Sequence, residues 1–470
     1  MGRSSGDLKA NRIQIEEKEN NGEETVDTEI EVPDGGYGWV VLLAVFLYNF
    51  CTWGANAGYA VYLAHYLEQN TFPGGNKLDF AAIGGLSYGA GLLFSPLITV
   101  LSHKTSVHFT IAIGIVFQGA GLLLAAFSKK LRQIYLTQGL LISLGLAFIL
   151  IPSISLLPQW FRTKRSLAMG IATGGSGLGG IMYNLAMQRI IEKKSVKWAL
   201  IVQFILGTTL SFIALLLTRT RREIVLKNSK VEVQLLDKQL LINLCPWLIY
   251  GWVSMTVLGY IILLYSLSAF TTSLGYSSEQ GSYVSCMVSV GNVVGRPIIG
   301  HIADRYGPIS IGVLVHLLVA IFAWAMWIPC RNLATAITFA LIEGALMGTL
   351  WPILGSVLAR AVGLRKLDAA FSTMWLFLAI SSIPAPVIGL QLRSNDPSDP
   401  NTYINTALLA GFGYFCAAIF LWLLRGYIIA RDNSISDSKA VDKDELHIKV
   451  SPLALLGGLM TVKSTSQRVV

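Results

Sequence analysis

The sequence is dominated by apolar runs that are long enough to cross a lipid bilayer as helices. A helix needs about 20 residues to span the hydrocarbon core, and twelve stretches of the chain fit that requirement. Only 13% of the residues are charged, about half of the share in a soluble protein. We therefore predict an all-α membrane protein with twelve transmembrane helices. The predicted spans are Gly38–Leu63, Phe80–Leu101, Phe109–Phe127, Ile134–Leu157, Leu167–Ile191, Trp198–Leu217, Leu244–Phe270, Gln280–Ile302, Ile309–Ile328, Ala334–Val362, Ala369–Leu390 and Thr406–Leu424.

A polar segment in the middle of the chain divides the predicted spans six and six. This segment holds many of the Lys and Arg residues found between spans, and an excess of Lys and Arg favours the cytoplasmic side. An even number of spans then predicts that both tails are cytoplasmic. The expected organisation is an acidic disordered tail (1–37), a six-helix half (38–218), a central cytoplasmic loop (219–243), a second six-helix half (244–425) and a C-terminal tail (426–470).

Two short motifs stand at the entrances to the first and fifth spans. The first is Pro-Asp-Gly-Gly-Tyr-Gly-Trp-Val at 33–40, and the second is Trp-Phe-Arg-Thr-Lys-Arg-Ser-Leu-Ala-Met-Gly at 160–170. Together they resemble the two signatures of the monocarboxylate transporter family, a branch of the major facilitator superfamily, and are most similar to its fungal homologues. The resemblance covers the membrane region, about 33–430. It implies two halves that rock about a site near the bilayer midplane, as superfamily transporters do.

A third motif, Gly-His-Ile-Ala-Asp-Arg-Tyr-Gly at 300–307, lies between the eighth and ninth spans. It is similar to a loop shared by the superfamily, and an Asp beside a helix N-terminus can hold two helix ends together. We expect Asp304 and Arg305 to act in gating, with Lys164 and Arg165 at the start of the fifth span. The equivalent loop of the first half, 101–105, lacks the motif, so we expect the halves to be latched on one side only.

Glycines repeat at four-residue spacing in the fifth and eighth spans. They include Gly170 and Gly174 in the fifth and Gly291 and Gly295 in the eighth. Small residues at this spacing let membrane helices approach closely. The resemblance implies that these two helices pack against each other.

Two charged residues stand out within the predicted spans, where a charge is costly unless it is paired or faces water. Arg296 lies in the eighth span and Glu343 in the tenth. We predict that Arg296 binds substrate; the alternative is a long side chain that snorkels to the cytoplasmic interface. Glu343 is a candidate for proton coupling, or it lies near the outer interface.

The resemblance also indicates where this chain departs from the family. The family pairs the Arg that matches Arg296 with an Asp one turn earlier, and it carries a Lys in the first helix. Here these positions are Asn292 and Ala57. The anion-binding Arg is kept, while the acidic partner and the Lys are missing, so coupling to protons through that pair is in question.

Polar and aromatic residues within other spans complete the candidate substrate site. We assign Asn292, Asn56, Trp53, Gln138 and Tyr265 to it. The alternative for each is a helix–helix hydrogen bond or a packing contact.

Several other functions are disfavoured. The net charge of +9 comes from short basic clusters between apolar runs, so we expect no nucleic-acid partner. The sequence lacks GxSxG, HExxH and P-loop motifs, and the six His and five Cys residues form no metal-ligand spacing. We predict no enzyme, no cofactor and no metal.

The sequence therefore predicts a secondary active transporter that moves a small organic solute, with a monocarboxylate or related organic anion as the first candidate. The alternatives are a larger or neutral metabolite such as a vitamin, or a non-transporting membrane sensor of the same fold. The expected partners are a small-molecule substrate, the lipid bilayer and, for a symporter, a proton. The expected location is the plasma membrane, with the vacuolar membrane as the alternative. The sequence leaves the oligomeric state and the role of the C-terminal tail open.

Overall fold

The computed structural model describes residues 33–69, 71–221, 237–363, 366–394, 401–438 and 452–460. Residues 1–32 of the predicted disordered tail, most of the central loop and Arg365 lie outside these residues. Within them, eleven helices are long and apolar enough to cross a membrane. The twelfth is α11 (Arg165–Lys193), which is long enough but rich in glycine and polar residues.

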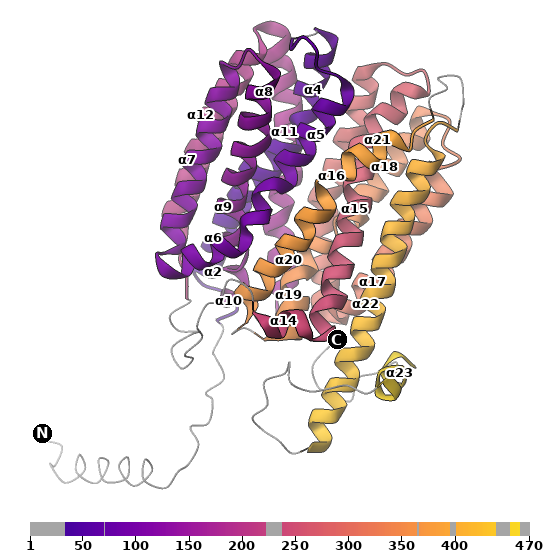
Figure 1. Ribbon diagram of the computed structural model, residues 1–470. Helices are drawn as coiled ribbons and strands as arrows, with labels where there is room; N and C mark the ends of the chain where they lie inside the picture. Colours follow the sequence, from indigo (N-terminus) through magenta and orange to yellow (C-terminus); the bar gives the residue numbers. More distant parts are fainter. Residues whose placement is uncertain are drawn as a thin grey trace, which may run out of the picture. The chain divides into compact units, whose positions relative to one another are not determined.

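The first half consists of six transmembrane passes, several of which are interrupted. Figure 1 draws these helices in indigo to magenta, gathered on one side of the bundle. The passes are α2 (Gly38–Asn49) with η1 (Phe50–Gly54), α3 (Ala55–Ala57) and α4 (Tyr59–Glu68); α5 (Lys77–Gly89) with η2 (Ala90–Phe94) and α6 (Ser95–Lys104); α7 (Val107–Ala126); α8 (Leu131–Ile134) with η3 (Tyr135–Leu141), α9 (Ile142–Ile154) and α10 (Leu157–Trp160); α11; and α12 (Val196–Leu217).

The second half repeats this plan from α15 to α22, drawn in pink to yellow on the other side of the bundle (Figure 1). A short helix, α14 (Lys238–Ile242), precedes it. The passes are α15 (Leu244–Ser273); α16 (Ser278–Tyr306); α17 (Pro308–Phe322) with η4 (Ala323–Trp327); α18 (Leu333–Met347) with α19 (Leu350–Val362); α20 (Leu367–Ser382) with α21 (Ala385–Gln391); and α22 (Ile404–Ser438). The last described helix is α23 (Pro452–Met460).

Particular residues mark where several helices begin or are interrupted. Ser106 and Ser195 accept a hydrogen bond from the backbone three residues on and so cap α7 and α12. The tenth pass breaks at Gly348, between α18 and α19. In the first pass, η1 is a π-helical segment, a form that often occurs at functional sites.

The bundle has two ends, which we name by the chain. The loop end is where α12 finishes at Leu217 and α14 begins at Lys238; the far end is opposite. Helix α22 continues at the loop end to Ser438, past its apolar stretch. There α23 packs against it, and the backbones of Gly426 and Gly458 come into close contact.

The expected pairing of the fifth and eighth passes is confirmed. A methyl group added at Gly170 would collide with the carbonyl oxygen of Arg296, and one at Gly177 would lie 2.8 Å from that of Ser289. Only glycine permits so close an approach. Because α11 faces other helices over much of its surface, it spans the bundle with less apolar side chain than its neighbours.

Candidate functional site

A cavity of about 550 Å³ lies between the two halves and is lined by side chains from both. The first half contributes α2, η1, α3, α5 and α11, and the second contributes α15, α16 and α19. The cavity includes four of the predicted substrate-site residues besides Arg296. Its lining is Asn49, Trp53, Asn56, Ala57, Tyr88, Ser176, Gly177, Tyr260, Leu264, Tyr265, Ser289, Asn292, Arg296 and Trp351.

Arg296 is buried in the wall of this cavity, with 2% of its surface exposed. Its Nη1 donates to the carbonyl oxygen of Thr173 at 2.5 Å and to Oγ of Ser176 at 2.6 Å. Both acceptors belong to α11, so the guanidinium reaches from one half to the other. The side chain points into the helix interface and does not snorkel to the membrane surface.

The charge of Arg296 has no acidic partner among the described residues. No Asp or Glu lines the cavity, and Nε of Arg296 forms no hydrogen bond within the described part of the chain. Asn292, at the family's acidic position, donates to Val288 O at 3.1 Å, and its Oδ1 accepts no bond from a described residue. Both side chains crowd Gly348, where a methyl group would lie 2.7 Å from Arg296 Nε. The break between α18 and α19 therefore leaves space for this pair.

The other predicted residues fall in different places. Asn56 lines the cavity and exchanges hydrogen bonds with Ser87, to its carbonyl oxygen and from its Oγ, both 3.2 Å. Trp53 and Tyr265 also line the cavity. Gln138 does not: it lines a second cavity, of about 400 Å³, within the first half, and it donates to the hydroxyl of Tyr66 at 3.1 Å.

Glu343 is fully buried but does not line the cavity of Arg296. Neither of its carboxyl oxygens has a hydrogen-bond partner among the residues that the structure describes. An ionised carboxylate there would be a buried charge without compensation. It lies within α18 and not near the end of the span.

The gating candidates meet at the loop end, around the start of α11. Asp304 accepts hydrogen bonds from the backbone N–H groups of Ser166 and Leu167, both at 2.8 Å. This contact joins α16 of the second half to α11 of the first. Arg165 donates to the carbonyl oxygen of Phe161 at 3.1 Å, whereas Lys164 and Arg305 are exposed.

The two family-like signatures touch each other at the same place. Asp34 accepts bonds from the backbone N–H of Arg162 at 2.5 Å and of Thr163 at 2.8 Å. The ring of Trp39 stands edge-on to Phe161, with 5.2 Å between centroids. The start of α11 is thus held by two carboxylates, Asp34 from its own half and Asp304 from the other.

The first half makes a second contact at the loop end, which the sequence did not predict. Nε2 of His103, near the end of α6, lies 3.1 Å from Oδ2 of Asp368, in the first turn of α20. The expectation that the halves are latched on one side only is therefore wrong. In place of the missing motif at 101–105, the side chains of His103 and Asp368 form the contact.

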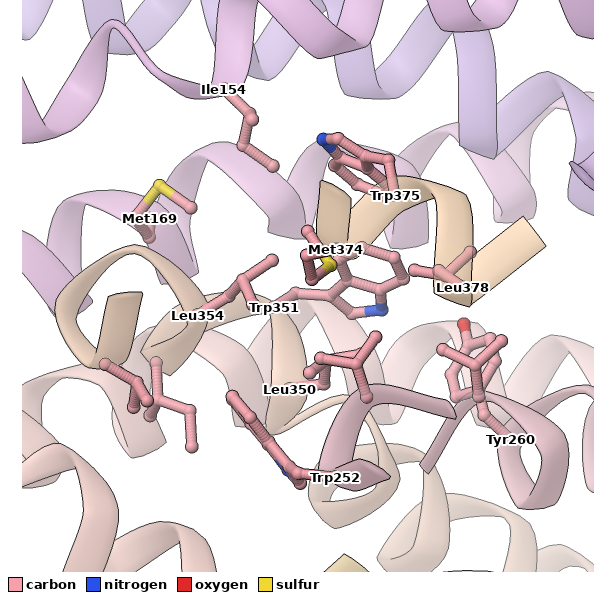
Figure 2. Close-up of a cluster of buried hydrophobic side chains, with 14 of the residues drawn as sticks. Ile154, Met169, Trp252, Tyr260, Leu350, Trp351, Leu354, Met374, Trp375 and Leu378 are labelled. Carbon is pink, nitrogen blue, oxygen red and sulfur yellow. The ribbon is translucent and has the colours of Figure 1, made fainter. Parts of the chain in front are cut away.

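An apolar cluster fills the space between the cavity and the loop end. Figure 2 shows Trp351 amid Leu354, Met374 and Trp375, with Ile154 of the first half nearby. All five side chains are at least 96% buried. Together with the two loop-end contacts, this packing closes the path from the cavity to the loop end in the described conformation.

Nine lining residues were not assigned to the site from the sequence, and they include Tyr88, Ser176, Tyr260 and Trp351. Trp351 carries a signal that could have been used. Tryptophans of membrane proteins concentrate at the interfaces, and Trp351 lies in the middle of the tenth pass. A Trp in that position does not anchor the helix at the membrane interface, so it serves another role.

Two six-helix halves that enclose a central cavity, closed at one end by contacts between the halves, define a carrier of small solutes and not an enzyme. The chain belongs to the major facilitator superfamily, whose family model matches residues 41–386. It is a secondary transporter and an integral membrane protein, as members of this family are.

Individual relatives agree with that assignment. The chain is 55% identical to "Probable transporter MCH2" of Saccharomyces cerevisiae over 98% of its own length and 97% of the relative's. It is 26% identical to monocarboxylate transporter 12 of Mus musculus, covering 84% of this chain and 86% of that one. Among solved structures, the proton:xylose symporter XylE superposes with a TM-score of 0.64 at 12% identity, over 83% of this chain and 94% of that chain. This last likeness concerns the fold alone.

Proposed function

We propose that the protein transports a small organic anion, with a monocarboxylate as the leading candidate, by alternating access at the cavity of Arg296. The observation that carries the proposal is a buried guanidinium with no acidic partner in the described chain. The proposal also agrees with the name of one relative, monocarboxylate transporter 12, which matches most of the chain.

The hydrogen bonds of Arg296 leave its charge uncompensated. Thr173 and Ser176 offer dipoles and no negative charge, and a charge in a membrane span is costly unless something neutralises it. A bound carboxylate would supply the counter-charge, and an arginine fork suits two carboxylate oxygens. Asn292 strengthens the argument, because the acid that would compete with a substrate anion is absent.

A role for Glu343 in proton coupling is a second, separable part of the proposal. Its carboxyl group is fully buried and has no hydrogen-bond partner among described residues, which is the environment of a group that gains and loses a proton as its access changes. Because Glu343 lies outside the cavity lining, the proton would bind apart from the anion. Glu343→Gln should then remove the dependence of uptake on the pH gradient, while exchange of substrate at equal pH continues.

Transport by Arg296 variants in proteoliposomes tests the anion site. Uptake of a labelled monocarboxylate panel should fall at least about thirtyfold in Arg296→Gln, since loss of a buried charge contact costs about 2–5 kcal/mol. Arg296→Lys keeps the charge but loses the planar fork, and should transport about tenfold more slowly than the wild type. Arg189→Gln, which removes the same charge from an exposed position on α11, is the matched control. Wild-type uptake by Arg296→Gln would show that Arg296 is structural and that the assigned site is wrong.

A larger or neutral metabolite such as a vitamin remains the second candidate, because aromatic and polar side chains line the cavity together, as they do in many sites for small molecules. Uncharged members of the panel, tested on the same vesicles, separate the two. We place the protein in the plasma membrane; a fluorescent fusion found on the vacuole would favour the alternative.

A further inference from the structure

Four aromatic rings form a continuous row across the boundary between the two halves. The ring centroids of Tyr88 and Trp53 are 4.3 Å apart, those of Trp53 and Trp351 5.8 Å, and those of Trp351 and Trp375 6.0 Å. Tyr88 and Trp53 come from the first half, and Trp351 and Trp375 from the second, where Figure 2 shows the last two side by side. Within this row, the pair of Trp53 and Trp351 is the one that joins the first half to the second.

Three rings of this row also form part of the cavity wall. Tyr88, Trp53 and Trp351 line the cavity, and the phenol rings of Tyr260 and Tyr265 line it as well. Ligand sites are commonly apolar and aromatic, with a few placed polar groups. Here the aromatic wall faces the same cavity as the guanidinium of Arg296.

Two rings of the row, those of Trp53 and Trp375, have a buried Nε1 without a hydrogen-bond partner among the described residues. Buried Trp N–H groups usually find an acceptor. Only Trp53 of the two lines the cavity, so a ligand in the cavity could accept a hydrogen bond from Trp53 but not from Trp375.

A short-chain acid would use little of this site. It would reach Arg296 with its carboxylate but would offer no flat surface to the rings. A flat ring that bears a carboxylate can meet both features at once, because aromatic rings attract each other through offset or edge contacts.

We propose that the transported anion is an aromatic or heteroaromatic monocarboxylate, whose ring lies against the wall formed by Trp53 and Trp351 while its carboxylate binds Arg296. This inference rests on the proposed anion site and narrows it to one substrate class. Trp53 and Trp351 belong to different halves. A substrate ring can therefore contact both side chains only while the two halves are packed together at this point.

Four probes separate the contributions of ring and charge in binding measurements on the purified full-length protein. They are benzoate, its saturated counterpart cyclohexanecarboxylate, the short acid lactate, and the uncharged ring compound benzyl alcohol. Benzoate should bind about tenfold more tightly than cyclohexanecarboxylate, which matches it in charge and approximate size but has no aromatic face. Lactate and benzyl alcohol should bind more weakly still, because each lacks one of the two contacts.

Variants of the wall then locate the effect. Trp351→Leu should weaken benzoate binding about tenfold and change cyclohexanecarboxylate binding less than about twofold, while Trp351→Phe should keep most of the preference for benzoate. Trp375→Leu is the matched control, because Trp375 belongs to the row but does not line the cavity. Size-exclusion profiles check that each variant is folded. If Trp351→Leu does not fold, the comparison is made with Trp351→Phe instead.

The outcomes distinguish this inference from the function on which it rests. Equal binding of benzoate and cyclohexanecarboxylate, or a preference for lactate, would overturn the aromatic inference and leave an anion site. Binding of benzyl alcohol as tight as that of benzoate would overturn the anion site itself. If the folded protein bound none of the four, both would be wrong.

Discussion

Two of the contacts that join the halves at the loop end involve a carboxylate, and they use different chemistry at equivalent places. In one, the carboxylate of Asp304 accepts from the backbone N–H groups of Ser166 and Leu167. In the other, His103 lies against the carboxylate of Asp368. Each contact ties the last turns of a half's second helix to the first turn of the other half's fifth helix.

The difference shows which contact is fixed and which is adjustable. The donors to Asp304 are backbone N–H groups, which any residue except proline at 166 and 167 would supply and which are always protonated. The His103 contact needs two particular side chains and is a full ion pair only when the imidazole carries a second proton. We infer that Asp304 sets the closed state of the loop end and that His103 and Asp368 tune it.

The largest effect should follow from Asp304→Asn. Hydrogen bonds to a charged group contribute about 1.5–3 kcal/mol, so losing the charge should lower the ratio of closed to open loop ends at least about tenfold. Pulsed electron paramagnetic resonance between spin labels at Thr105 and Lys238, which are exposed on opposite halves, measures that ratio. An unchanged distance distribution would mean that the contact does not hold the halves.

A smaller shift is expected from His103→Gln. The pair is partly exposed to solvent, and such ion pairs contribute about 0.2–1 kcal/mol, so the same ratio should change less than about fivefold. Combined with Asp304→Asn, the shifts should add in free energy, because the two contacts share no partner. A shift in His103→Gln larger than that in Asp304→Asn would reverse our ranking.

No shift in the ratio is expected from Asp34→Asn. Asp34 also binds backbone N–H groups at the start of α11, but both sides of that contact belong to the first half. Its φ of 51° is one that Asn tolerates well, so the backbone should keep its path. The melting temperature, followed by size-exclusion fluorescence, should fall by about 1–3 °C. A change in the distance between the spin labels would show that the Asp34 contact and the Asp304 contact at the start of α11 depend on each other.

Much of the fold follows from apolar length. All twelve passes were predicted as long apolar runs, and eleven of them meet the hydropathy criterion in the structure. The fifth, α11, falls short because it is rich in glycine and polar residues; its glycines predicted the close packing against the eighth pass. Asp304 was recognised because its motif lies in one short stretch. The pairing of His103 with Asp368 could not be predicted from the sequence, because the two residues are distant in the chain and neither lies in a recognised motif.

The candidate site was only partly predictable for a related reason. Buried charge identifies Arg296 and Glu343 as unusual, yet it does not indicate which cavity each one faces. A helix that is apolar on all sides gives no periodic signal of its inner face. Gln138 therefore looked equivalent to Asn56, although the two face different surroundings, Gln138 only the smaller cavity and Asn56 both.

The π-helical segment η1 has a consequence for how the substrate site can change over evolutionary time. A π turn holds one residue more than an α turn, so deleting a residue from Phe50–Gly54 would convert it to a regular turn instead of breaking the helix. Residues on both sides of the deletion would then keep their present faces, because the regular turn covers the same rotation with one residue fewer. Asn56 and Ala57 would still line the cavity, and only the local widening of the helix would be lost. Descendants of this chain could thus lose a residue beside the cavity through a single codon, with the rest of the lining unchanged.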